Sequence, residues 1–270
     1  MLIAAPPEGP FEIPEIVGTL AAGRDVEAVW RNGTGGITFR IGAGPTREFL
    51  KWSPQESGVD LGEEIRRLEW AVRFTPVPRV VSQGSDEHGS WFVTAGLPGL
   101  SAVDVRWKQD PATAVRAIGA GLRMMHERLP VADCPFDRDL ATRLALARQE
   151  VAAGRVDLAT WHEDARARVT SAEHALELVT NDVPPIDRLV VCHGDSCAPN
   201  TLVGDDGTCV GHVDLDTLGV ADRWADLATA SWSTTWNYGP GWEEPLLEAY
   251  GVEPDWERIH YYRLLWQLVD

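Results

Sequence analysis

The sequence contains few basic residues. Only 24 Lys and Arg stand against 41 Asp and Glu, which gives the 270-residue chain a formal net charge of −17 at pH 7. Because a phosphate backbone binds to basic surfaces, this balance argues against a nucleic-acid partner. An acidic field attracts small polycations instead, although acids that merely keep a surface soluble are the more common case.

Long apolar runs are absent as well. No segment approaches the roughly 18 uninterrupted apolar residues that a membrane-spanning helix requires. The first residues, MLIAAPPEGPFEIPEI, lack the basic start and sustained apolar core of a signal peptide. We therefore expect no membrane association and a cytoplasmic protein. We also expect a monomer or a weak homodimer.

Cysteine is scarce too, with four residues at positions 134, 192, 197 and 209. In a cytosolic chain of this length such residues are more often reduced thiols than disulfides. Cys192, Cys197 and Cys209, together with His193 and His212, suggest zinc at first sight. However, no C-x-x-C pair is present and the spacings fit no common zinc finger, so we expect no zinc site.

The first part of the chain has the pattern of a small sheet with one helix. Alternating apolar and polar residues at 26–41 and 47–52, around NGTGG and GAGPT, predict two antiparallel strands with turns. Helical spacing from Leu61 to Val72 predicts an amphipathic helix. The stretches VPRVVSQG and SWFVTAGLPG then predict two further strands.

The rest of the chain has mainly helical periodicity. Helices are predicted at 115–129, 140–151, 171–180, 224–231, 242–250 and 256–269. Short strands are predicted at 188–192, 201–203 and 209–213. The fold class is therefore α+β with two lobes, a small β-rich lobe at 1–96 and a larger α-rich lobe at 97–270, with a cleft between them.

The stretch HGDSCAPN places one acid and one amide five positions apart, directly after an apolar run. Phosphoryl transfer requires a base near the attacking hydroxyl and cations over the phosphates, and the cations require hard oxygen ligands. Asp195 and Asn200 have the D-x-x-x-x-N spacing used for this purpose. Asp214 follows in HVDLD after a short strand and offers a second ligand for Mg²⁺.

A nucleotide such as ATP also needs a cation at its α and β phosphates. Lys51 lies on a predicted strand, and Glu64 lies on the next helix, where it can orient the ammonium group. Upstream, RNGTGG includes Thr34 and Gly35, whose N–H groups are candidates to cover phosphates. The turn lacks G-x-G-x-x-G, and a plain hairpin turn explains it equally well. Each feature is weak alone, but the ordered set is hard to obtain by chance.

Four motifs resemble those of the aminoglycoside O-phosphotransferases, antibiotic-resistance kinases related in fold to protein kinases. They are VVCHGDSCAPNTLV, GVADRWADLA, DCPFDRDL and IHYYRLL, and the similarity runs from about residue 26 to 266. The resemblance implies a two-lobed, protein-kinase-like fold, with ATP and Mg²⁺ as cofactors. It further implies Asp195 as the catalytic aspartate, Asn200 and Asp214 as magnesium ligands, and Lys51 paired with Glu64 at the α and β phosphates.

The same resemblance assigns supporting roles. Residues 94–97, with Ala95 and Leu97, would be the hinge that meets adenine, and Asp226 would be the structural aspartate. His193 would brace the catalytic loop through hydrogen bonds. The family's D-x-G is here Asp214-Leu215-Asp216. An aspartate in place of glycine removes backbone freedom and adds a charge, which either shifts the affinity for metal or faces solvent.

The residues that would choose the substrate differ from those of kanamycin-modifying relatives. Those relatives carry acids near the C-terminus, in sequences like LLDEFF, whereas this chain ends in LLWQLVD and has Trp266 and Gln267 there. Trp232 and Trp236 lie in the helix that follows Asp226. Tryptophan faces attract cations and stack well with guanidinium groups, although a single Trp is more often core.

The resemblance therefore implies a small polycationic aminoglycoside substrate, with the 3''-hydroxyl of streptomycin favoured and the 3'-hydroxyl of kanamycin-type compounds next. Two alternatives remain open. One is a kinase of another small hydroxylated metabolite, and the other is a catalytically inactive kinase-like binding protein. The complete set of Lys51, Asp195, Asn200 and Asp214 argues against the inactive protein. The absence of an APE segment after Asp214 argues against a protein kinase.

Overall fold

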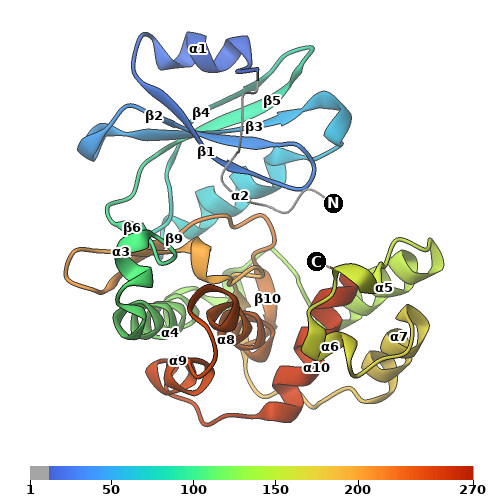
Figure 1. Cartoon of the computed structure of the whole chain (residues 1–270). Coiled ribbons are helices and arrows are strands. Elements are labelled where there is room, and N and C mark those ends of the chain that lie inside the picture. Colours follow the sequence, from blue (N-terminus) through green and yellow to red (C-terminus); the bar gives the residue numbers. More distant parts are fainter. Residues whose placement is uncertain (1–11, 270) are drawn as a thin grey trace. The chain divides into compact units, whose positions relative to one another are not determined.

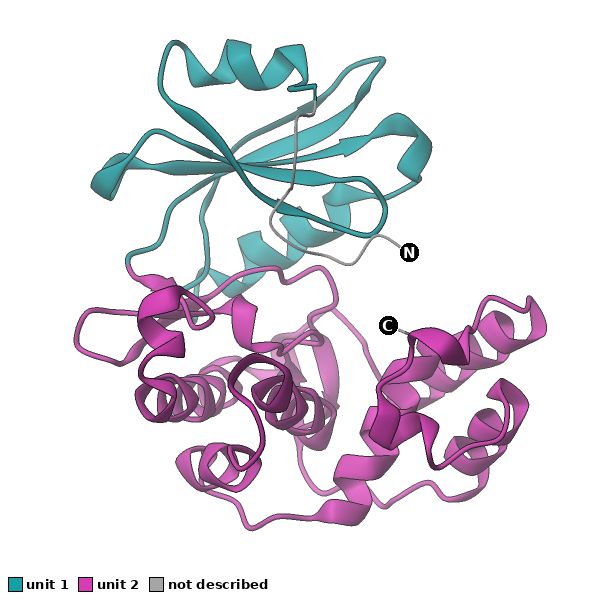
Figure 2. Cartoon of the chain, in the orientation of Figure 1, with its two compact units in different colours: residues 1–98 teal, residues 99–270 magenta. Residues whose placement is uncertain are grey.

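The computed structural model describes residues 12–269 and divides the chain between Pro98 and Gly99 into two compact units (Figure 1, Figure 2). We predicted a boundary between residues 96 and 97. The division of nucleotide binding and catalysis between the two parts stays a prediction. Within residues 12–269, no helix combines the length and the apolar character needed to cross a bilayer.

The first unit contains a five-stranded antiparallel sheet in the order β1-β2-β3-β5-β4. Its strands are β1 (Val26–Arg31), β2 (Ile37–Ile41), β3 (Glu48–Pro54), β4 (Val80–Ser85) and β5 (Gly89–Ala95). The prediction of two strands before residue 53 was therefore wrong, because three are present. The turn between β1 and β2 is closed by Asn32, whose side-chain oxygen accepts hydrogen bonds from the backbone N–H groups of Thr34 and Gly36.

Two helices cover the sheet of this unit, with α1 (Glu15–Ala21) over one face and α2 (Leu61–Ala71) over the other (Figure 1). Val17 of α1 packs with buried residues of three strands, among them Phe39, Leu50 and Val93. The predicted helix at 61–72 is α2, and it begins where the side chain of Asp60 accepts a hydrogen bond from the N–H of Gly62. Short 3₁₀ turns, η1 (Gly44–Thr46) and η2 (Gln55–Ser57), flank β3.

The second unit is mainly helical. Its helices are α3 (Val105–Lys108), α4 (Pro111–Arg128), α5 (Leu140–Ala152), α6 (Glu163–Arg166), α7 (Ala172–Asn181), α8 (Trp224–Tyr238), α9 (Glu243–Tyr250) and α10 (Trp256–Val269). The six predicted helices are confirmed as α4, α5, α7, α8, α9 and α10. Residues 224–234 of α8 are all buried, and α10 packs against α5, α6, α7 and α8. The core of the unit is thus assembled around α8 and α10.

Five short strands complete the second unit. They are β6 (Leu100–Ser101), β7 (Leu189–Cys192), β8 (Thr201–Val203), β9 (Cys209–His212) and β10 (Gly219–Asp222), with 3₁₀ turns η3 (Val131–Asp133), η4 (Leu158–Thr160) and η5 (Ala198–Asn200). The predicted strands β7, β8 and β9 are confirmed, whereas β6 and β10 were not predicted. β7 pairs antiparallel with β10, and β8 lies between β6 and β9. The segment 193–200 therefore connects two small sheets.

Candidate active site

The segment 193–200 is anchored to the buried side chain of Asp226, in the first turn of α8. The backbone N–H groups of His193 and Gly194 donate to its carboxylate oxygens at 2.6 and 2.9 Å. The hydroxyl of Ser196 donates to the backbone carbonyl of Asp226 at 2.7 Å. Further along, the N–H of Ala198 donates to Ser233 Oγ on the same helix. One helix thus fixes the loop that carries Asp195.

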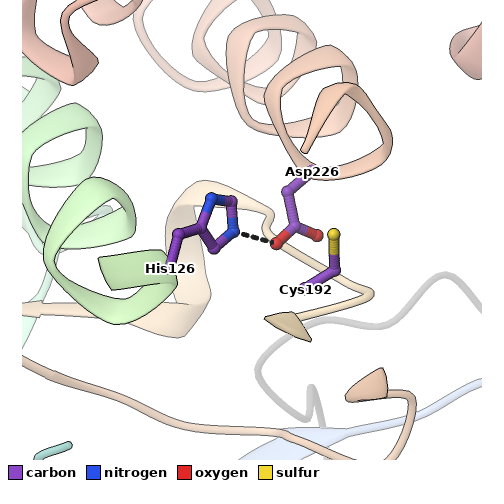
Figure 3. A group of neighbouring side chains, drawn as sticks. All are labelled: His126, Cys192 and Asp226. Carbon is purple, nitrogen blue, oxygen red and sulfur yellow. Dashed lines mark hydrogen bonds and ion pairs between the residues drawn. The ribbon is translucent and has the colours of Figure 1, made fainter. Parts of the chain in front are cut away.

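Asp226 also contacts a side chain from α4. His126 Nε2 donates to Asp226 Oδ2 at 2.9 Å, and the Cys192 side chain at the end of β7 points toward the same place (Figure 3). Burial alone would raise the pKa of Asp226, but the hydrogen bond and the charge of His126 outweigh it and lower this pKa to about 2. Asp226 therefore stays ionised as an acceptor for the loop.

His126, Cys192 and Asp226 offer three potential metal ligands within 4.8 Å of one another. The carboxylate oxygens of Asp226 already accept hydrogen bonds from His126, His193 and Gly194. Burial raises the pKa of Cys192 well above its ordinary value, so the thiol stays protonated, whereas a metal requires the thiolate. This arrangement fits a structural role for the cluster better than a metal site.

Asn200 contacts Asp195 at the end of this loop, and the backbone next to Asp214 is hydrogen-bonded to Asn200. The side-chain Nδ2 of Asn200 donates to the backbone carbonyl of Asp195 at 2.9 Å and to its carboxylate at 3.0 Å. The backbone carbonyl of Asn200 accepts a hydrogen bond from the N–H of Val213, at 3.0 Å. Asp214 directly follows Val213, so this hydrogen bond holds the backbone before Asp214 beside Asn200.

His193 also contacts Val213. Its Nε2 donates to the backbone carbonyl of Val213 at 3.0 Å, so the ring braces the loop as the resemblance implies. Asp214 itself has a left-handed backbone, with φ of 64°. For a residue other than glycine this conformation costs roughly 1–2 kcal/mol, and aspartate is one of the residues that adopt it. Strained residues of this kind concentrate at functional sites.

The aspartate that replaces the family's glycine lies in a turn. Asp216 is exposed, and its φ is not positive, so this position does not need the conformational freedom of glycine. Of the two expectations for Asp216, the structure favours the one in which its side chain faces solvent.

The predicted phosphate-binding pair lies in the first unit. Lys51 is in the middle of β3, between Thr38 of β2 and Phe92 of β5. Its ammonium group lies 2.6 Å from Glu64 Oε2 on α2, and only 4% of Glu64 is exposed. A carboxylate this deeply buried requires a partner, so the pair fixes where the ammonium group lies.

The two predicted nucleotide-contacting stretches have internal hydrogen bonds. In the turn after β1, the N–H of Gly35 donates to the carbonyl of Asn32, and the N–H of Thr34 donates to the Asn32 side chain, as in a plain hairpin turn. At the end of β5, Ala95 N–H donates to the carbonyl of Arg79, and after β5 the carbonyl of Leu97 accepts a hydrogen bond from the side chain of Arg47. The chain after β5 is thus tied to the residue that precedes β3.

The tryptophans that we predicted as substrate contacts form one aromatic cluster. The ring centroid of Trp232 lies 5.2 Å from that of Trp236 and 6.1 Å from that of Trp266, and Trp236 lies 5.9 Å from Trp266. Trp232 is only 2% exposed, and the guanidinium of Arg263 lies over its ring at 5.2 Å. Trp236 remains 36% exposed. The surface that the cluster offers to a ligand is therefore that of Trp236 rather than Trp232.

The sequence did not point to His162, which completes this cluster. Its ring stacks on Trp236 with centroids 4.1 Å apart and planes at 2°. Its backbone N–H donates to the side-chain oxygen of Gln267 at 3.3 Å. His162 precedes α6, far from α8 and α10 in the sequence, and no spacing connects the three elements. Only the fold brings them together.

His212 gives the stability of the fold a dependence on pH. It is 2% exposed at the end of β9, and burial lowers its pKa to about 3, with a contribution from the neighbouring His193. The unfolded chain therefore binds more protons between about pH 6.5 and pH 3. We expect the free energy of unfolding to decrease as the pH is lowered through this window, by up to about 1.4 kcal/mol per pH unit from this residue.

Urea unfolding at about pH 7 and about pH 5.5 tests this expectation. The free energy of unfolding should decrease less between these two pH values in His212→Leu than in the wild type. His88→Leu is the control, since the side chain of His88 is 74% exposed. Equal pH dependence in the wild type and His212→Leu would show that His212 carries none of the effect.

Comparison with known proteins agrees with this geometry. The model of the phosphotransferase enzyme family matches residues 20–262. An aminoglycoside 3'-phosphotransferase of Streptomyces fradiae is 39% identical over 253 residues, which cover 88% of this chain and 92% of the relative. A streptomycin 3''-kinase of Streptomyces griseus is 34% identical over 260 residues, which cover 92% and 93%.

Solved structures show the same fold. A type VIII aminoglycoside-3'-phosphotransferase has a TM-score of 0.78 at 31% identity, over 91% of this chain and 94% of that one. The aminoglycoside phosphotransferase APH(3'')-Id of Streptomyces rimosus has a TM-score of 0.77 at 27% identity, over 95% and 99%. The resemblance drawn from the motifs is thus confirmed. The chain belongs to the phosphotransferase enzyme family and has the two-lobed, protein-kinase-like fold of the aminoglycoside phosphotransferases.

Proposed function

We propose that the chain is an ATP-dependent O-phosphotransferase that phosphorylates a hydroxyl of an aminoglycoside. The observation that carries the proposal is the contact between Asn200 and Asp195 in a loop anchored to buried Asp226. It fixes a carboxylate beside a hard-oxygen donor, as phosphoryl transfer requires. The names of the relatives support aminoglycosides as the substrate class.

In the proposed reaction Asp195 orients the acceptor hydroxyl and takes its proton. The hydroxyl oxygen attacks the γ-phosphorus of ATP in line, a new O–P bond forms, and the bond to the leaving ADP oxygen breaks. The hydrogen bond from Asn200 Nδ2 keeps the Asp195 carboxylate in one orientation. Asp195 thus acts mainly on the transition state and little on the binding of nucleotide.

The residues present fit a magnesium ion. Because Asn200 Nδ2 donates twice to Asp195, the other amide atom, Oδ1, is the one that Asn200 offers to a metal. Asp214, next to Val213, adds a carboxylate, and both are hard oxygen donors of the kind that Mg²⁺ prefers. A bound Mg²⁺ would neutralise negative charge on the phosphates.

We propose that residues 1–96 bind the nucleotide and that residues 97–270 carry catalysis and the substrate site. Lys51, oriented by Glu64, would contact the α and β phosphates. The turn with Thr34 and Gly35 would cover the phosphates, and the backbone at Ala95 and Leu97 would meet adenine. A relative solved in complex with ADP and streptomycin, with a TM-score of 0.68 at 26% identity, supports ATP as the donor.

For the acceptor we propose the 3''-hydroxyl of streptomycin first and the 3'-hydroxyl of kanamycin-type compounds second. The identities to the two kinds of relative, 34% and 39%, do not separate these choices. The aromatic cluster favours streptomycin, because its guanidinium groups stack on tryptophan. Trp236 and Trp266, with Gln267 beside His162, would form the contact surface, backed by buried Trp232.

The setting of the reaction is also a proposal. The enzyme would act in the cytoplasm as a monomer or a weak homodimer, without a nucleic-acid or membrane partner. The acidic balance of the chain, −17 at pH 7, is consistent with attraction of a polycationic substrate.

A coupled assay of ADP release against streptomycin, kanamycin, neomycin and hygromycin tests the proposed function. We expect release that depends on the aminoglycoside, with streptomycin the best substrate. Good turnover of kanamycin with none of streptomycin would overturn the substrate order and leave the kinase standing. If no aminoglycoside is turned over, the two alternatives differ in outcome, since a metabolite kinase still transfers phosphate to another hydroxyl and an inactive protein only binds nucleotide.

Trp236→Ala tests the aromatic contact. If a guanidinium stacks on this ring, its loss should remove about 0.5–2 kcal/mol, so KM for streptomycin should rise roughly two- to thirtyfold with less effect on kanamycin. Trp256→Ala is a matched control, because Trp256 has a similar exposure, 38%, and contacts His260 outside the cluster. Unchanged kinetics of Trp236→Ala with streptomycin would remove this residue from the substrate site.

A further inference from the structure

The motif CPFD has no role in the reaction as described so far, yet the fold places it beside the catalytic loop. The N–H of Val220 donates to the carbonyl of Phe136 at 2.9 Å, and the N–H of Arg138 donates to the carbonyl of Val220 at 3.1 Å. Asp137 thereby forms a parallel bridge with Val220 in β10. Since β10 pairs with β7, the segment 136–138 extends the small sheet from which the catalytic loop emerges.

The Arg138 side chain reaches the loop itself. Its Nη2 donates to the backbone carbonyl of Gly194 at 3.1 Å. This carbonyl belongs to the peptide bond that joins Gly194 to Asp195. The N–H of Gly194 donates on its other side to Asp226 Oδ1 at 2.9 Å. The residue before the catalytic aspartate is therefore held by a guanidinium at its carbonyl and by a carboxylate at its N–H.

The surrounding backbone leaves the loop little room to adjust. Gly194 has a φ of +92°, and a Cβ there would lie 2.4 Å from the carbonyl oxygen of Thr217. Gly219 lets the segment approach, because a Cβ at that position would lie 3.0 Å from the backbone N and from Cβ of Arg138. Arg138 supplies a contact at the carbonyl of the peptide that precedes Asp195.

We propose that Arg138 is a positioning residue for Asp195. By holding the carbonyl of Gly194 it fixes the plane of the Gly194–Asp195 peptide, and with it the direction in which the Asp195 carboxylate meets the acceptor hydroxyl. The inference rests on the proposed kinase function. It assigns a task to Arg138, the residue that directly follows the CPFD motif.

Arg138→Met and Arg138→Lys test the proposal, with kcat and both KM values measured with ATP and the preferred aminoglycoside. Because small displacements of a catalytic group cost up to about a hundredfold, kcat of Arg138→Met should fall roughly ten- to a hundredfold. Both KM values should stay within about twofold, as expected when only the transition state is affected. Arg138→Lys keeps a charged donor, so it should recover part of kcat.

A purely structural role would give another pattern. The urea midpoint of each variant separates loss of fold from loss of rate, and if Arg138→Met does not fold, Arg138→Lys alone decides. Arg138→Met should lower kcat far less when Asp195→Asn is already present than it does in the wild type, because Arg138 acts through Asp195.

Three outcomes would overturn the proposal. In the first, a folded Arg138→Met keeps the kcat of the wild type, and the kinase assignment stands. In the second, the effects of the Asp195 and Arg138 substitutions on the activation free energy add in the double variant, which would mean that Arg138 does not act through Asp195. In the third, the wild type phosphorylates no hydroxyl compound, and then the proposed function falls and this inference falls with it.

Discussion

Asp195→Ala should lower kcat for aminoglycoside phosphorylation by at least about a hundredfold while KM for ATP stays nearly unchanged. In the proposed reaction the carboxylate orients the acceptor hydroxyl and accepts its proton, so its removal should destabilise the transition state. The loop should keep its shape, because Asn200 still donates to the backbone carbonyl of residue 195 and Asp226 still holds His193 and Gly194. Steady-state kinetics with varied ATP and varied aminoglycoside measure both effects.

The control is Asp205→Ala, in which an aspartate side chain that is 96% exposed is removed from the same lobe. It should leave kcat and KM unchanged. Near-normal turnover by Asp195→Ala would remove this residue from the catalytic site, whatever the family resemblance implies.

Asp226→Ala should destabilise the fold by about 3–5 kcal/mol, as expected when a buried charged partner is lost. The substitution leaves the N–H groups of His193 and Gly194 without acceptors, and each buried unsatisfied group costs about 1–3 kcal/mol. His126 loses its carboxylate partner in the same step. The free energy of unfolding in urea measures the loss.

Asp226→Asn serves as the comparison for this variant. The Asn side chain is similar in size to Asp and keeps one oxygen acceptor. We therefore expect a loss of stability between zero and that of Asp226→Ala. A loss below about 1 kcal/mol in Asp226→Ala would mean that the loop is held by other contacts and that Asp226 is not its anchor.

Local patterns predicted much of the fold. The face of Val115, Ile118, Leu122 and Met125 identified α4, and all four side chains are buried there. Period and length are properties of one segment, which is why the main helices and β7 to β9 could be found. β6 was missed because two residues are too few to show a period, and β10 was missed because its sequence GVAD contains glycine and aspartate, which strands disfavour.

The candidate site divides in the same way. Asp195, Asn200 and Asp214 were predicted because phosphoryl transfer needs those residue types at that spacing. In the fold Asn200 contacts Asp195 and the residue before Asp214, which is Val213. Burial could not be predicted for the aromatic residues. Trp232 is of a residue type that suits contact with a cationic ligand, yet it lies in the core, with the guanidinium of Arg263 over its ring. His162 and Arg138 act through contacts across elements, which no local pattern encodes.

The central claim is that this chain transfers the γ-phosphoryl group of ATP to an aminoglycoside through Asp195. Mass spectrometry of streptomycin after incubation with the protein, ATP and Mg²⁺ tests it most directly, with Asp195→Ala run beside the wild type. We expect the wild type to add one phosphoryl group, at the 3''-hydroxyl, and the variant to leave streptomycin almost entirely unmodified. Unmodified streptomycin and kanamycin after incubation with a folded, ATP-binding wild-type protein would contradict it.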